Sequence, residues 1–261
     1  MPVSAQGLAY EWYGDDGLPP LVLASGLGGL GGYWEPNLGA LSQDYRVLTY
    51  DQRGCGGSTS DANPTVAAMA ADLAALLDEL ALDEAPGLVG HALGGMIGLQ
   101  LAMDRPELVL RVMMVNGWAS LDPHTARCFD TRLALLRDSG PAAYLRATPL
   151  FLYPPAWVSA HDAALLTEET EARAYLPAAA VIEARVHAAR LFDPGAYRLG
   201  AVATPVMCLA SEDDALVPAH CSEALTKLLP HATLASFASG GHAVNVTRPD
   251  DFNARVQDWL R

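Results

Sequence analysis

The sequence predicts an α/β fold with a mostly parallel central sheet flanked by helices. Short apolar runs of strand length alternate with stretches of helical spacing over residues 1–121 and 196–261. Glycine and polar residues follow the apolar runs, where the carboxyl ends of parallel strands would lie. The alternation stops over residues 122–195, where the pattern is helical and interrupted by prolines. We therefore expect a sheet domain in two parts, 1–121 and 196–261, with an inserted helical cap, 122–195.

The expected elements follow one another in chain order. Residues 66–82 have helical spacing, because Met69, Leu73, Leu76, Leu77 and Leu80 fall on one side. The apolar run at residues 88–89 leads into a second helical pattern, and the strand before the cap is stopped by the polar pair at 116–117. The expected strands are residues 8–13, 20–24, 45–50, 88–89, 108–115, 205–210 and 233–237, and further helices are expected at 96–103, 220–229 and 250–260.

Composition narrows the class of protein. A chain of 261 residues that is 51% hydrophobic suits one compact domain with an insertion. Its net charge of −14 disfavours nucleic acid and anionic membranes as partners. Four cysteines (Cys55, Cys128, Cys208 and Cys221) lack the spacing of a metal site or a disulfide pair. With no visible signal peptide or membrane-length apolar run, we expect a cytoplasmic protein with no metal and no cofactor.

The most informative motif is GHALGG at residues 90–95, between an expected strand and an expected helix. Small residues on both sides of such a turn are typical of the nucleophile elbow of α/β-hydrolases, whose usual pattern is Gly-x-Ser-x-Gly. Ala92 stands where the serine would stand. We therefore expect an α/β-hydrolase fold whose site works without a serine hydroxyl.

In α/β-hydrolases the order along the chain is nucleophile, acid, histidine. His242 follows two glycines in the loop after a late strand, and we expect a general base there rather than a buried or helix-capping histidine. The acid lies in SEDD at 211–214, which could also be a solvated turn. We choose Asp214 over Asp213 because ALVP at 215–218 is the usual sequence after that acid.

A glycine-rich loop, SGLGG at residues 25–29, follows an early strand. In this fold such a loop donates one amide to the oxyanion hole, here that of Leu27, and the residue after the elbow, Leu93, donates the other. A tight connection is the alternative interpretation. A phosphate loop is excluded, because the Gly-Lys-Ser/Thr signature is missing.

Four residues are expected to bind substrate. Ser25 lies in the glycine-rich loop, and Asn116 and Trp118 close the strand before the cap, where they contact substrate or only terminate the strand. Arg127, which shares the start of the cap with His124 and Arg132, is the expected charged contact for an anion. Its alternative is an exposed helix face.

Six segments resemble the RutD family: SGLGG at 25–29, YDQRG at 50–54, GHALG at 90–94, VNGW at 115–118, PLFLYP at 149–154 and GGHAVNVT at 240–247. RutD belongs to the bacterial Rut pathway, which takes nitrogen from uracil and thymine. The resemblance implies a carbamate hydrolase or an aminoacrylate hydrolase, and it implies that alanine at the elbow is natural.

The expected function is therefore hydrolysis of a small C–N substrate, with a small anion as ligand. His242, held by Asp214, would activate water or pass a proton to nitrogen, without a serine nucleophile. Three alternatives stay open: a non-catalytic relative that binds a metabolite, a cofactor-free lyase or dioxygenase, and an esterase whose elbow serine was engineered to Ala92. A homodimer is compatible with the sequence.

Overall fold

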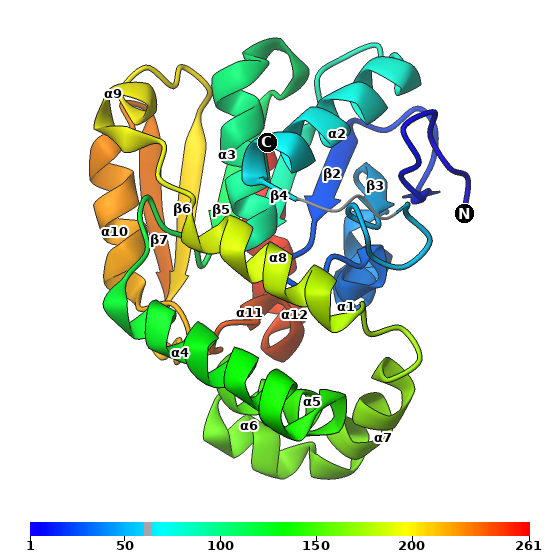
Figure 1. The fold of residues 1–261 in the computed structure, drawn as a ribbon. Coiled ribbons are helices and arrows are strands. Elements are labelled where there is room, and N and C mark those ends of the chain that lie inside the picture. The colour runs from blue at the N-terminus through cyan, green and yellow to red at the C-terminus, as the bar shows by residue number, and fades with distance from the viewer. Residues whose placement is uncertain (60–63) are drawn as a thin grey trace.

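A computed structural model describes residues 1–59 and 64–261. In this part of the chain a seven-stranded sheet has the order β1-β3-β2-β4-β5-β6-β7 (Figure 1). Strand β1 runs antiparallel to β3, and the other neighbouring strands are parallel. The predicted α/β class is confirmed. The strands are β1 (Tyr10–Tyr13), β2 (Pro20–Ala24), β3 (Arg46–Tyr50), β4 (Gly87–His91), β5 (Arg111–Val115), β6 (Val206–Ser211) and β7 (Ala232–Phe237).

Helices cover both faces of the sheet (Figure 1). Outside the segment between β5 and β6 they are α1 (Glu35–Leu41), α2 (Val66–Leu80), α3 (Leu93–Asp104), α10 (Ala219–Leu228), α11 (Val244–Thr247) and α12 (Pro249–Leu260). Helix α2 ends two residues before the expected boundary, because Ala81 takes a left-handed φ of 45°. Strand β5 begins later than expected, because Pro106–Leu108 form a 3₁₀ turn.

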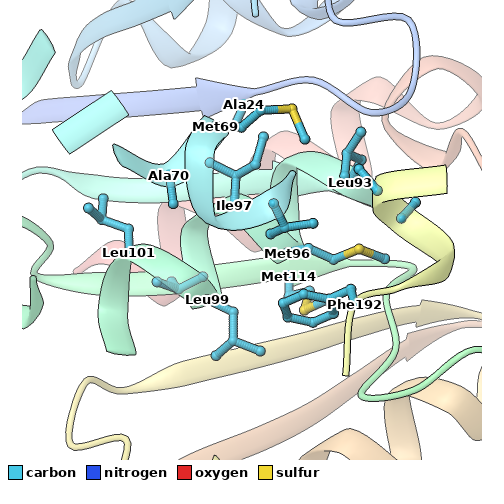
Figure 2. Close-up of a cluster of buried hydrophobic side chains, with 14 of the residues drawn as sticks. Ala24, Met69, Ala70, Leu93, Met96, Ile97, Leu99, Leu101, Met114 and Phe192 are labelled. Carbon is cyan, nitrogen blue, oxygen red and sulfur yellow. The ribbon is translucent and has the colours of Figure 1, made fainter. Parts of the chain in front are cut away.

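The strand side chains alternate between two apolar layers, as the two-residue period of a strand requires. One layer packs the sheet against α2 and α3, and Figure 2 shows its centre, where Ala24 and Met114 of the sheet lie near Met69, Met96 and Ile97 of these helices. Helix α3 is buried over its first ten residues, as expected for a helix that is apolar on all sides. The opposite layer packs against α1 and α12 and includes Leu21, Leu23, Trp34, Val89, Met113 and Phe252.

The segment between β5 and β6 contains only helical elements, and its residues 123–190 lie across the lower end of the sheet in Figure 1, whereas its last helix lies near the upper end. Strands β2, β4 and β5 end on this side, so the segment covers the loops that follow them. We call it the helical insertion. Its helices are α4 (Pro123–Ala134), α5 (Pro141–Leu152), α6 (Pro155–Ala160), α7 (Asp162–Ala172), α8 (Ala179–Arg190) and α9 (Gly195–Leu199), with a π turn at Leu135–Ser139.

Glycine allows α3 to approach the strands closely at its first turn. A Cβ atom on Gly94 would overlap the backbone carbonyl of Ala24, and one on Gly90 would overlap the backbone of Gly94 and Gly95. Backbone atoms cannot move aside as a flexible side chain can. The glycines of the elbow motif are therefore required by packing between β2, β4 and α3.

We expect Gly94→Ala to lower the free energy of unfolding by about 2 kcal/mol or more, as overpacking against fixed backbone does. Gly39→Ala is the matched control, since Gly39 is exposed in α1 and a Cβ there meets open space. That change should raise the free energy of unfolding by about 0.5–1 kcal/mol. Urea unfolding measures both, and equal stability of Gly94→Ala and the unchanged protein would contradict the packing argument.

Candidate active site

A cavity of about 400 Å³ lies between the carboxyl edge of the sheet and the helical insertion. Its wall is mostly apolar, which is typical of small-molecule sites. The sheet side contributes Ser25, Leu27, His91, Ala92, Leu93 and His242, and the insertion contributes residues from α4, α5, α7 and α8. Loops after β2, β4 and β7 thus meet at one place.

The elbow at the base of the cavity keeps a strained backbone. Ala92 has φ 47° and ψ −109°, outside the regions that residues with a Cβ favour. Its amide donates to the carbonyl of Val115 at 2.8 Å, and α3 begins at the next residue. The conformation that presents a nucleophile is therefore retained, although a methyl group occupies the position.

His242 and Asp214 form a buried pair beside the elbow. His242 Nδ1 donates to Asp214 Oδ2 at 2.7 Å, and the other carboxylate oxygen accepts from the amides of Leu216 and Val217 at 2.7 and 2.9 Å. Because the carboxylate holds the proton on Nδ1, Nε2 keeps its lone pair. His242 lines the cavity, so the pair can deliver a base to a bound molecule or to water.

The loop that carries His242 is held from both sides. Asp213 Oδ1 accepts from the amides of Gly240 and Gly241 at 2.9 and 2.8 Å. Asn116 Nδ2 donates to the carbonyl of His242 at 2.7 Å, and its Oδ1 accepts from the amide of Ser211 at 2.9 Å. The two neighbouring aspartates therefore differ: Asp214 contacts the imidazole, whereas Asp213 positions the backbone before it.

A second histidine, His91, supports the same loop. Its Nε2 donates to the carbonyl of His242 at 2.8 Å, and its ring stacks on Tyr33 and lies 4.6 Å from the ring of His242. Burial lowers the pKa of His91 well below its ordinary value, and the neighbouring His242 adds to this shift. His91 is therefore neutral at pH 7 and adds no positive charge beside His242.

The glycine-rich loop at residues 25–29 is held in place by a fully buried arginine of the helical insertion. Arg185 on α8 donates from Nη2 to the carbonyl of Gly26 at 3.2 Å and from Nε to that of Leu27 at 2.9 Å. In a planar trans peptide the C=O and the following N–H point in opposite directions. Arg185 therefore turns the amide of Leu27 away from itself. Gln52 completes the network, bonding to the Ser25 carbonyl and to Arg185.

The start of α3 supplies another backbone amide at the cavity. Leu93 is the first residue of this helix, and first-turn amides have no acceptor within a helix. Among the described residues, no backbone or side-chain acceptor is paired with the amides of Leu27 and Leu93. Both residues line the cavity beside Ala92 and His242. A developing negative charge at this place would meet two amides and the positive end of α3.

Comparison with known proteins identifies the family to which this chain belongs. Residues 19–249 match the alpha/beta hydrolase fold family. The chain is 46% identical to a protein of Variovorax paradoxus, over 97% of this chain and 96% of that one, and 44% identical to one of Caulobacter vibrioides, over 98% and 96%. Both carry the name carbamate hydrolase RutD. This chain belongs to the RutD family.

The predicted resemblance to RutD is thus confirmed along nearly the whole chain. A crystal structure of a hydrolase from Pseudomonas aeruginosa has the same fold, with a TM-score of 0.83 and 27% identity over 97% of this chain and 94% of that one. The α/β-hydrolase fold expected from the elbow is therefore confirmed. In this RutD-family chain, no helix of residues 1–59 and 64–261 is both long enough and apolar enough to cross a bilayer.

Two of the expected substrate contacts lie elsewhere. Arg127 is exposed and does not line the cavity, because the side of α4 that faces the cavity carries Phe129 and Arg132, and Arg127 lies on the opposite side of the helix. Asn116 is buried below the cavity and bonds to backbone groups rather than facing the cavity. Ser25 and Trp118 do line the cavity, and Ser25 Oγ and Trp118 Nε1 have no partner among the described residues.

One group of metal-ligand types lies outside this cavity. Asp122, His220 and Cys221 place their ligand atoms within 4.8 Å of one another. His220 is already paired with Asp122 at 3.0 Å, and burial raises the pKa of the Cys221 thiol to about 12. All four cysteines are free and buried.

His91 and Arg185 are site residues that sequence reasoning missed. His91 is the variable residue of the elbow motif, so its position beside Ala92 was a usable signal. Arg185 is separated from Leu27 by 158 residues and lies in a helix with several other charged side chains, so the sequence alone offers no signal.

We expect Arg185→Met to lower the free energy of unfolding by about 2–4 kcal/mol, because it removes the donor to the Leu27 carbonyl and to the Gln52 side-chain oxygen, and one of the two donors to the Gly26 carbonyl. Arg185→Lys keeps the charge but cannot reach all three acceptors in one plane, so it should lose a smaller amount. Arg190→Met, on the same helix, removes a partly exposed ion pair with Asp130 and should cost less than about 1 kcal/mol. Thermal or urea unfolding ranks the variants, and equal effects at positions 185 and 190 would contradict the anchoring role.

Proposed function

We propose that this RutD-family protein hydrolyses the C–N bond of a small anion, with His242 as general base and no covalent intermediate. The substrate is carbamate, which yields ammonia and carbon dioxide, or 3-aminoacrylate, which yields malonate semialdehyde and ammonia. The observation that carries the proposal is the buried 2.7 Å pair of His242 and Asp214 beside an elbow that holds Ala92. The names of the related RutD proteins support a carbamate as substrate.

With carbamate, water replaces the missing nucleophile. His242 Nε2 takes a proton from water while the hydroxide adds to the carbonyl carbon, and the charge that develops on oxygen is held by the amides of Leu27 and Leu93. Asp214 stabilises the resulting imidazolium. The imidazolium then gives its proton to nitrogen, the C–N bond breaks, and ammonia leaves with bicarbonate, the hydrated form of carbon dioxide.

With 3-aminoacrylate, the same groups direct water to the carbon that bears nitrogen instead of to a carbonyl carbon. A proton from solvent adds to the carbon next to the carboxylate and converts the enamine into an iminium ion. The hydroxyl group formed in the next step returns one proton to solvent when the aldehyde forms, so the protons balance. His242 activates water for addition to the carbon that bears nitrogen, and the imidazolium then protonates nitrogen so that ammonia leaves. The product is malonate semialdehyde. In this case the substrate carboxylate accepts hydrogen bonds from the amides of Leu27 and Leu93.

A catalyst of this kind needs only a modest rate enhancement. Serine hydrolases that have lost their triad keep roughly 10³–10⁴-fold acceleration from the oxyanion hole and binding. Carbamate and aminoacrylate also hydrolyse without an enzyme, so the assay compares ammonia release from freshly prepared substrate with and without protein. Because the protein has a net charge of −14, the anion must be held by local donors rather than by the overall field.

We expect His242→Ala to reduce the protein-dependent rate of ammonia release by about 10²-fold or more, because proton transfer is lost. Asp214→Asn should reduce it less, since the acid orients the imidazole and stabilises its charged form. Asp213→Asn should reduce it least, because its role is in the Gly240–Gly241 turn. A larger loss at Asp213 than at Asp214 would reassign the acid, and a wild type with no effect on either substrate would favour a non-catalytic binding protein.

We expect Ala92→Ser to create an esterase activity that the natural chain lacks. The strained elbow, the paired base and the free amides are all in place, so a hydroxyl there would complete an acyl-transfer site. Incubation with p-nitrophenyl acetate should give a burst and an acetyl adduct in Ala92→Ser and neither in the unchanged protein. The double variant with His242→Ala is the control and should lose the burst. An adduct on the unchanged chain would show a nucleophile at another residue.

A further inference from the structure

The cavity wall opposite the sheet contains a buried arginine with no role in the chemistry proposed above. Arg132 lies in the last turn of α4, is 6% exposed and lines the same cavity as His242. Its Nη2 donates to the hydroxyl of Tyr144 at 2.9 Å, while its Nε is buried and has no partner among the described residues. The guanidinium also lies over the rings of Tyr144 and Phe151, 5.0 and 5.7 Å from their centres.

No carboxylate of the described residues forms an ion pair with Arg132. Three arginines of the helical insertion are paired: Arg137 with Glu183, Arg146 with Glu169 and Arg190 with Asp130. The buried Arg185 has no carboxylate either, but it donates to three neutral oxygens, those of Gly26, Leu27 and Gln52, and Arg132 has no such set of acceptors among the described residues. An arginine side chain stays charged in proteins, and a buried charge without an anion is unfavourable. The missing anion is therefore expected from a ligand in the cavity.

One acidic side chain also lines the cavity. Glu168 of α7 lies at the edge where α7 meets α5, and it forms no ion pair with Arg132. Partial burial raises the pKa of Glu168, and the nearby Glu171 raises it further. This shift favours the neutral acid, so Glu168 opposes an anionic ligand less than an ordinary glutamate would.

The size of the cavity points to a ligand larger than carbamate. A cavity of about 150 Å³ is sufficient for benzene in another protein, and this cavity measures about 400 Å³. Carbamate is smaller than benzene and would leave most of the space empty. The wall shared by Arg132 and His242 is mostly apolar and includes Trp118, Leu145, Leu152, Ile182, Leu216 and Val217.

We propose that Arg132 forms a carboxylate-binding subsite, so that the cavity accepts an elongated monocarboxylate with an apolar segment between its carboxylate and its C–N bond. The carboxylate accepts hydrogen bonds from the guanidinium of Arg132, the apolar segment lies along the aliphatic wall, and the C–N bond lies at His242. The placement of the C–N bond at His242 rests on the proposed function. The subsite itself rests only on Arg132 and the cavity.

Calorimetric titration with hexanoate, hexanamide and acetate at neutral pH tests the subsite without turnover. Hexanoate should bind at least about tenfold more tightly than hexanamide, which has the same apolar chain and no charge, and more tightly than acetate, which has the charge and no chain. In Arg132→Gln the affinity for hexanoate should fall by about tenfold or more, while the affinity for hexanamide stays the same.

Two variants separate binding from structure. Arg127→Gln removes an exposed arginine from the same helix and should leave hexanoate affinity unchanged. Tyr144→Phe removes the protein partner of Arg132 but keeps the cation, and the preference for hexanoate over hexanamide should persist. If Arg132→Gln does not fold, the comparison is made between Arg132→Lys and the unchanged protein. The lysine keeps a point charge, so Arg132→Lys should keep part of the preference for hexanoate over hexanamide.

Equal affinity for hexanoate and hexanamide in the unchanged protein would overturn the subsite, as would a preference that survives in Arg132→Gln. The two proposals fail in different ways. If carboxylate binding depends on Arg132 but no C–N substrate releases ammonia, the proposed hydrolase function is wrong and the proposed subsite stands. If the protein releases ammonia from carbamate but binds hexanoate and hexanamide equally, the proposed subsite is wrong and the proposed hydrolase function stands.

Discussion

The turn from β4 into α3 is the constraint on which the rest of the site depends. Gly90 and Gly94 let the helix begin within contact of the strand backbone, and Ala92 takes the positive φ that this short turn requires. The same turn fixes the first amide of α3 at the cavity and places His91 under the loop of His242. Three parts of the site, the elbow position, one oxyanion donor and the support of the base, are thus set by one backbone conformation.

Buried hydrogen bonds to carbonyl groups hold the remaining parts. The carbonyl of His242 accepts from both His91 and Asn116, and the carbonyls of Gly26 and Leu27 accept from Arg185. Each bond fixes a peptide plane, so each also fixes the direction of an amide or of the side chain that follows. Such a site is organised before any ligand enters, which is the condition for electrostatic stabilisation without reorganisation.

Sequence reasoning succeeded where the information is local. The strands and the elbow follow from short motifs in a fixed order. The structure also pairs the side chains of His242 and Asp214, whose catalytic roles stay predictions. Sequence reasoning failed where the answer depends on packing. Arg127 and Arg132 are five residues apart on one helix, and only the position of α4 on the sheet decides which of them faces inward. Arg185 reaches Leu27 across 158 residues, which no local pattern can reveal.

The alanine at the elbow changes which molecule can act as nucleophile, and it leaves the rest of the site intact. A serine hydroxyl would stand between His242 and the substrate and would accept the acyl group itself. With a methyl group there, the elbow offers no side-chain nucleophile, and in the proposed reaction His242 activates water instead. The buried pair of Asp214 and His242 places a base at the cavity, which packing alone does not require. Retention of this pair without the hydroxyl supports the proposed direct attack by water rather than acyl transfer.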